Sequence, residues 1–115
     1  MGVRLKVGVT ITVTAQLDRM MRMAEVAYGE VMGPGFTVVI TSGNDGTHME
    51  GSLHFKNLAL DFRTGHNWEP PLMSEEEAHE ILEELKARLG IGFDVVLEKD
   101  HIHGEYDPKI GVKKP

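Results

Sequence analysis

The spacing of the apolar residues changes near Thr14, and this change limits the folds that the chain can adopt. Over residues 3–13, apolar side chains occupy every second position. This alternation is typical of a β-strand with one buried face. Over residues 17–31, apolar side chains instead recur at steps of three and four. The pattern predicts an amphipathic helix that begins at Thr14 as its N-cap and runs to about Gly29 or Met32.

The rest of the chain contains further strands and one more helix. The segment SEEE at 74–77 forms a complete capping-box pattern, in which Glu77 can accept a hydrogen bond from the Ser74 amide, and Gly90 ends the helix that follows. Short connections join the last strands, so we expect an antiparallel or mixed sheet with helices on one side, an α+β fold. Four further strands are predicted, over FTVVITS (36–42), residues 58–63, GFDVVLEK (92–99) and HIHGEYD (101–107).

Length and composition exclude several classes of protein. A chain of 115 residues is the size of one domain, so we assign 1–115 to a single domain, with 1–13 as an extra strand and 109–115 as a flexible tail. The formal net charge of -6 disfavours a nucleic-acid surface. No apolar run approaches the ~18 residues of a membrane span, and the first ten residues lack the apolar core of a secretory signal peptide. We therefore expect synthesis in the cytoplasm, no membrane insertion, and another route to any external site of action.

Two segments place histidines beside acidic residues. In SLHFKNLALD (52–61), His54 and Asp61 lie seven positions apart, and in KDHIHGEYD (99–107), Asp100 precedes His101 and His103. The chain has no cysteine, so a transition-metal site must use imidazole and carboxylate ligands. Histidines two apart on a strand point to the same face. One imidazole from each segment and one carboxylate would supply the three protein ligands of a catalytic zinc site.

These two motifs resemble those of a known family. Ser52-x-His54-x-x-x-x-Ala59-x-Asp61, followed by Asp100-x-x-His103, is similar to the pattern of the zinc D-Ala-D-Ala peptidases. That family includes D-Ala-D-Ala carboxypeptidases and dipeptidases and the L-alanyl-D-glutamate endopeptidases of phage lysins, and it shares a fold with the Hedgehog signalling domain. The resemblance extends over about residues 14–108.

The resemblance implies a function and a set of site residues. It implies a short, phage-type zinc peptidase that hydrolyses a D-Ala-D-Ala or L-Ala-D-Glu bond in a peptidoglycan stem peptide. Such a protein would act at the cell wall after it is released from the cytoplasm in the way that phage lysins are. It makes Asp100 the general base that takes a proton from the zinc-bound water. His101 would lie beside the reacting carbonyl, and Ser52 would help to hold the substrate. The zinc ligands that it implies are His54, Asp61 and His103.

Two positions depart from the family pattern. Asn57 replaces a glycine, and GNDG (43–46) stands where the family has an arginine that stabilises the developing oxyanion. Arg63, two residues after Asp61 on the same strand face, is the substitute that we assign, and Lys56 is another. We place His48 with the substrate-binding residues, since it can also provide positive charge.

The missing arginine keeps a second hypothesis open. A zinc-stabilised binding or structural module of the same fold, perhaps from a phage particle, would need no oxyanion stabiliser, whereas retention of Asp100 favours the enzyme. A zinc-independent hydrolase that uses Ser52 with His54 is disfavoured, because the chain has no G-x-S-x-G elbow.

Overall fold

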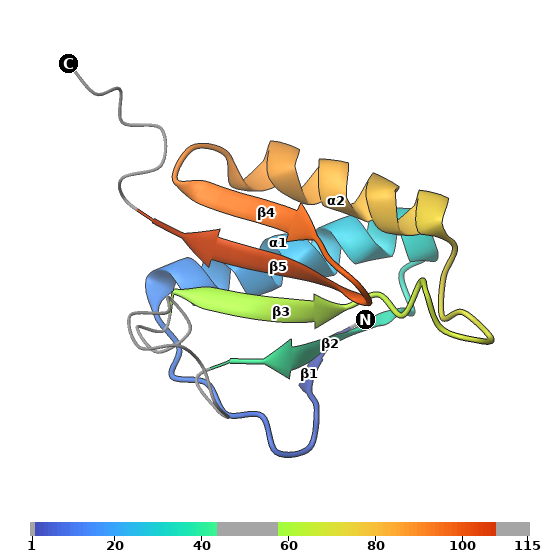
Figure 1. Cartoon of the computed structure of the whole chain (residues 1–115). Coiled ribbons are helices and arrows are strands. Elements are labelled where there is room, and N and C mark those ends of the chain that lie inside the picture. Colours follow the sequence, from blue (N-terminus) through green and yellow to red (C-terminus); the bar gives the residue numbers. More distant parts are fainter. Residues whose placement is uncertain (1, 44–57, 108–115) are drawn as a thin grey trace.

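The computed structural model describes residues 2–43 and 58–107. Its five strands form one mixed sheet in the order β1-β2-β3-β5-β4, and both helices cover the same face of this sheet (Figure 1). The predicted α+β fold class is confirmed, while its relation to the Hedgehog and D-Ala-D-Ala peptidase fold stays a prediction. The elements are β1 (Gly2–Leu5), α1 (Ala15–Met32), β2 (Thr37–Ser42), β3 (Ala59–Arg63), α2 (Glu75–Leu89), β4 (Phe93–Leu97) and β5 (His101–Tyr106).

The pairing of the strands brings distant parts of the sequence together. β1 and β2 are parallel and are connected through α1, whereas the β2–β3, β3–β5 and β5–β4 pairs are antiparallel. In the β3–β5 pair, Asp61 lies opposite His103 and Arg63 lies opposite His101. Consecutive side chains of a strand point to opposite faces, so these four side chains lie on the same face of the sheet.

The hydrophobic core lies between the sheet and the two helices. Both helices begin as predicted, with Thr14 and Ser74 as N-caps, and the capping box of Ser74 and Glu77 is complete. The apolar stripe predicted for the second helix is buried in full (Ala78, Ile81, Leu82, Leu85, Leu89). The sheet contributes alternate residues to the same core (Val38, Ile40, Leu60, Phe62, Val95, Ile102). The face of the sheet that is turned away from the helices is therefore the one that carries Asp61 and the two histidines.

The expectation of a strand through residues 3–13 is wrong beyond Leu5. Gly8 has a φ of +91°, and the Val9 amide donates a hydrogen bond to the Lys6 carbonyl, so the chain turns after β1. Alternating apolar residues indicate that one side of an extended segment is buried. An extended segment can be buried in this way without hydrogen bonding to a neighbouring strand, so the alternation alone does not establish a strand. Val9 is buried although it lies in no strand, whereas the Val7 side chain is 94% exposed.

The other element boundaries differ from the predicted ones by a few residues. The strand predicted for 92–99 covers Phe93–Leu97, and the one predicted for 58–63 begins at Ala59. The predicted tail, 109–115, lies outside the residues that the structure describes. Neither α1 nor α2 is long and apolar enough to cross a membrane.

Candidate metal centre on the face of the sheet opposite the helices

The candidate site begins with the pairing of β3 and β5. His101 and His103 flank Ile102, which is fully buried against the helices, so the two imidazoles share one face of the strand, as predicted, and this is the face opposite the helices. Across the ladder, the Asp61 side chain is only 15% exposed. The structure thus joins the carboxylate of the first motif to the histidines of the second, although 42 positions separate Asp61 from His103.

His103 is held between two carboxylates. Its Nδ1 lies 2.8 Å from Asp61 Oδ1, and its Nε2 lies 3.0 Å from Glu105 Oε1. The hydrogen bond to Asp61 is the main reason that the pKa of His103 rises from 6.5 to about 9, while partial burial opposes the rise. Without a bound cation, His103 is therefore an imidazolium at neutral pH and donates to both acids.

His101 is surrounded by three carboxylates. Its Nε2 lies 3.0 Å from Glu98 Oε1 and 3.8 Å from Asp61 Oδ2, and its Nδ1 lies 3.1 Å from Asp100 Oδ1. One ligand atom from each of Asp61, Glu98 and His101 lies within 4.8 Å of the others, close enough to bind a metal ion. Within residues 2–43 and 58–107, this is the one group of three such side chains.

Asp100 lies in the turn between β4 and β5, where backbone hydrogen bonds fix it. Its carbonyl accepts from the amides of Thr64, at 2.8 Å, and Gly65, at 2.9 Å, which attaches the turn to the end of β3. Its Oδ2 accepts from the Trp68 indole at 3.2 Å. Hydrogen bonding to His101 is the largest of the effects that lower the pKa of Asp100. The turn thus holds the Asp100 carboxylate against His101 and keeps its pKa below the usual value.

Arg63, the last residue of β3, carries a positive charge. Its Cζ lies 5.3 Å from the centre of the Trp68 ring, a cation–π contact, and its Nε is buried without a hydrogen-bond partner. The Tyr28 hydroxyl donates to the Arg63 carbonyl at 2.9 Å. The Arg63 backbone is thus tied to α1, and its guanidinium lies against Trp68.

The structure brings together some of the predicted site residues and leaves others untested. Asp61, Asp100, His101 and His103 form one contiguous network. The predicted zinc ligand His54 and the predicted substrate-binding residues, His48 and Ser52, lie outside the described residues.

Three members of the network were not anticipated from the sequence. Glu105 could have been found, because it follows His103 by two positions and shares its face of the strand. Glu98 contacts His101 because of the hairpin turn, and strand periodicity carries no signal for that contact. Trp68 comes from a loop that precedes α2, and no pattern in the sequence connects it with Asp100.

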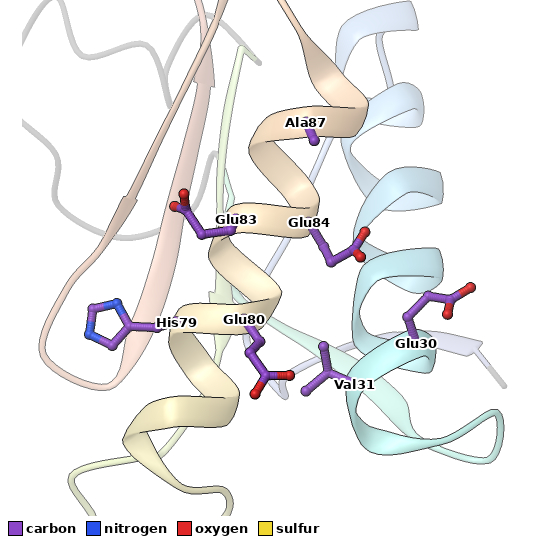
Figure 2. A pocket seen from close by; sticks show the side chains of 7 residues that line it. All are labelled: Glu30, Val31, His79, Glu80, Glu83, Glu84 and Ala87. Atoms are coloured by element: carbon purple, nitrogen blue, oxygen red, sulfur yellow. The ribbon is translucent and has the colours of Figure 1, made fainter.

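A concave region lies in the helix layer, away from this network. It is an open groove of about 530 Å³ between α1 and α2. Figure 2 shows Glu30 and Val31 reaching into it from α1, and Glu80 and Glu84 from α2, while His79 and Glu83 extend from the other side of α2. Glu84 is already paired with Arg88, at 3.2 Å. The groove contains none of the residues predicted for the site, and its carboxylates alone do not define one.

Comparison with known proteins does not assign the chain to a family. No protein-family model matches it, and no curated protein matches it either. The family resemblance therefore stays a prediction that rests on the two motifs.

Proposed function

We propose that this chain is a zinc-dependent peptidase that hydrolyses a peptidoglycan-type peptide at a D-Ala-D-Ala or L-Ala-D-Glu bond. One observation carries the proposal: Asp61 and His103, predicted as ligands from two separate motifs, lie with Oδ1 and Nδ1 2.8 Å apart. Asp100, from the second motif, is connected to Asp61 through the His101 imidazole, which contacts Asp100 with Nδ1 and faces Asp61 with Nε2. The two motifs require this convergence if they form one metal site, whereas strand periodicity alone does not.

The donor atoms of the network suit zinc. Two imidazoles and several carboxylates meet on one partly buried face, and mixed nitrogen and oxygen donors favour zinc or a similar transition metal over magnesium or calcium. Asp61 and His103 would hold the ion, and His54 would complete the set by resemblance. When bound, zinc would supply a Lewis acid that polarises the scissile carbonyl and makes water acidic enough to attack it.

The described side chains can carry the remaining steps of hydrolysis. The Asp100 carboxylate, which is ionised and 43% exposed, takes the proton of the attacking water and passes it to the leaving amine. Trp68 orients this carboxylate through its indole N–H. The Arg63 guanidinium, on the same face of β3 as Asp61, offers positive charge to the developing oxyanion.

The test separates metal binding from catalysis. We expect Asp100→Ala to retain zinc and to lose hydrolysis of a muropeptide, with products followed by mass spectrometry. Asp94→Ala is a matched control, because Asp94 is an exposed aspartate on the adjacent strand β4, and this variant should keep its activity. Full activity of Asp100→Ala would show that the base is another residue.

The ligand assignment has its own experiment. His103→Ala should lose bound zinc and melt at a lower temperature, whereas His79→Ala, which removes an exposed imidazole from α2, should do neither. Unchanged zinc content in His103→Ala would remove His103 from the ligand set.

A non-catalytic, zinc-stabilised module is the second candidate, and three contacts favour it. Both oxygens of Asp100 already have partners, His101 and Trp68, and the Arg63 guanidinium lies against an aromatic ring. Zinc binding without hydrolysis of any peptidoglycan fragment in the wild-type protein would favour this module over the enzyme.

A further inference from the structure

The two oxygens of the Asp61 carboxylate face two different imidazoles. Oδ1 lies 2.8 Å from His103 Nδ1, whereas Oδ2 lies 3.8 Å from His101 Nε2. Each imidazole also contacts a glutamate. Glu105 lies 3.0 Å from His103 Nε2, and Glu98 lies 3.0 Å from His101 Nε2, the same nitrogen that faces Asp61. Asp61 therefore belongs to two adjacent clusters of donor atoms on the same face.

The donor atoms exceed what one ion can use. A zinc ion takes about four ligands, and a catalytic one keeps one of these places open. The zinc site of the proposed function uses Asp61 and His103, and it does not use Glu98 or His101. These two side chains nevertheless converge with Asp61 Oδ2 within 4.8 Å, the spacing of ligands around one cation.

We propose that Asp61 Oδ2, Glu98 and His101 bind a second divalent cation, so that the Asp61 carboxylate bridges two ions. Two cations about 3.5–4 Å apart with a shared ligand are an established arrangement in hydrolytic metal sites. The second site stands on its own donor atoms, and only its description as second rests on the proposed function.

The hairpin between β4 and β5 keeps the two new ligands in register. The Glu98 amide donates to the His101 carbonyl at 2.8 Å, so the ends of the turn are fixed relative to one another. The Glu98 side chain is 50% exposed and the His101 side chain is 24% exposed, which leaves the cluster open to solvent. Because the exposed Glu98 side chain must lose conformational freedom to bind a cation, we expect the second ion to bind more weakly than the first. With two oxygens and one imidazole nitrogen, the cluster suits Zn²⁺, Mn²⁺ or Co²⁺.

The chain contains its own probe of this site. Trp68 is the single tryptophan, and its indole donates to Asp100, whose other oxygen contacts His101. A cation that binds His101 will change the electrostatic surroundings of this indole. Trp68 fluorescence should therefore change in a second phase of a zinc titration, after the first ion has bound.

The test counts ions in the full-length protein. After removal of metals by a chelator, the protein is dialysed against free Zn²⁺ and its zinc content is measured by atomic emission. We expect two ions in the wild type, one in Glu98→Ala and one in His103→Ala. Asp94→Asn, which removes one negative charge from the same sheet face without removing a donor of either cluster, should keep two. Glu98→Ala should also lose the second fluorescence phase.

The possible outcomes separate this inference from the proposed function. One ion in the wild type, retained in Glu98→Ala and lost in His103→Ala, overturns the second site and leaves the proposed zinc site intact. One ion that is lost in Glu98→Ala and retained in His103→Ala overturns both the two-ion arrangement and His103 as a ligand. Two ions in Glu98→Ala exclude Glu98 from the site, and no bound zinc overturns both proposals.

Discussion

The raised pKa of His103 gives the metal-free protein a stability that depends on pH. His103 titrates near 6.5 in an unfolded chain and at about 9 in the folded protein, because Asp61 and Glu105 hold its proton. Below pH 6.5 both states carry the proton, and the two contacts contribute their full stabilisation. Between pH 6.5 and 9 the unfolded state binds fewer protons, so the free energy of unfolding falls as pH rises. Above pH 9 this contribution is lost.

The size of the fall follows from the same two pKa values. A rise from 6.5 to about 9 corresponds to at most about 3 kcal/mol at 1.36 kcal/mol per pKa unit. The His103 side chain is 21% exposed, so solvent screens the interaction in part and we expect about 2 kcal/mol.

Urea unfolding of the chelator-treated protein, followed by circular dichroism between pH 6 and 9.5, measures this change. His103→Gln is the control, since it keeps a hydrogen-bonding side chain that does not titrate. The wild type should lose about 2 kcal/mol more than this variant over that pH range. Equal losses in the two proteins, or a wild-type stability that rises with pH, would refute the claim that Asp61 and Glu105 raise the pKa of His103 in the folded protein.

Four further substitutions test other parts of the structure. Phe62→Ala removes a fully buried ring and should lower the free energy of unfolding by about 3–5 kcal/mol in urea; a loss below 1 kcal/mol would contradict its place in the core. Ser74→Ala removes the side chain that caps α2 and should cost about 1 kcal/mol by the same assay, whereas an unchanged value would mean that the cap is dispensable. Gly65→Ala should destabilise the protein by more than about 1 kcal/mol, because Gly65 has a φ of +55° and a Cβ there would lie 2.8 Å from the Trp68 ring; equal stability would show that the loop has another conformation. Trp68→Phe keeps the ring beside Arg63 but removes the donor to Asp100, so kcat for a muropeptide should fall about fivefold, as about 1 kcal/mol of hydrogen bonding implies, at unchanged zinc content; an unchanged kcat would exclude Trp68 as a positioning residue.

The helices and the inner strands could be predicted because one-sided burial leaves a periodic record in the sequence. Ser74 and Glu77 predict the start of α2, since a capping box satisfies specific amides at a helix N-terminus. The same reasoning failed after Leu5. Alternation records which side chains are buried, whereas a strand also requires a backbone partner, and the turn at Gly8 takes the chain away from β2.

The site could be predicted only where chemistry and strand geometry agreed. The spacing of His101 and His103 predicts that they share one face, and the motif places Asp61 with them, as the β3–β5 register has it. The contacts of Glu98 and Trp68 depend on how a hairpin and a loop fold back on the end of β3. Such contacts are set by tertiary structure and leave no periodic trace in a single sequence.

The most direct test of the central claim is the binding of zinc to Asp61, the one residue shared by both clusters. Calorimetric titration of Zn²⁺ into the chelator-treated, full-length wild type and Asp61→Ala proteins measures it, with circular dichroism to establish that the variant is folded. We predict that the wild type binds zinc and that the folded Asp61→Ala protein has lost this binding. Equal affinity and stoichiometry in the two proteins would contradict a metal centre on this face of the sheet.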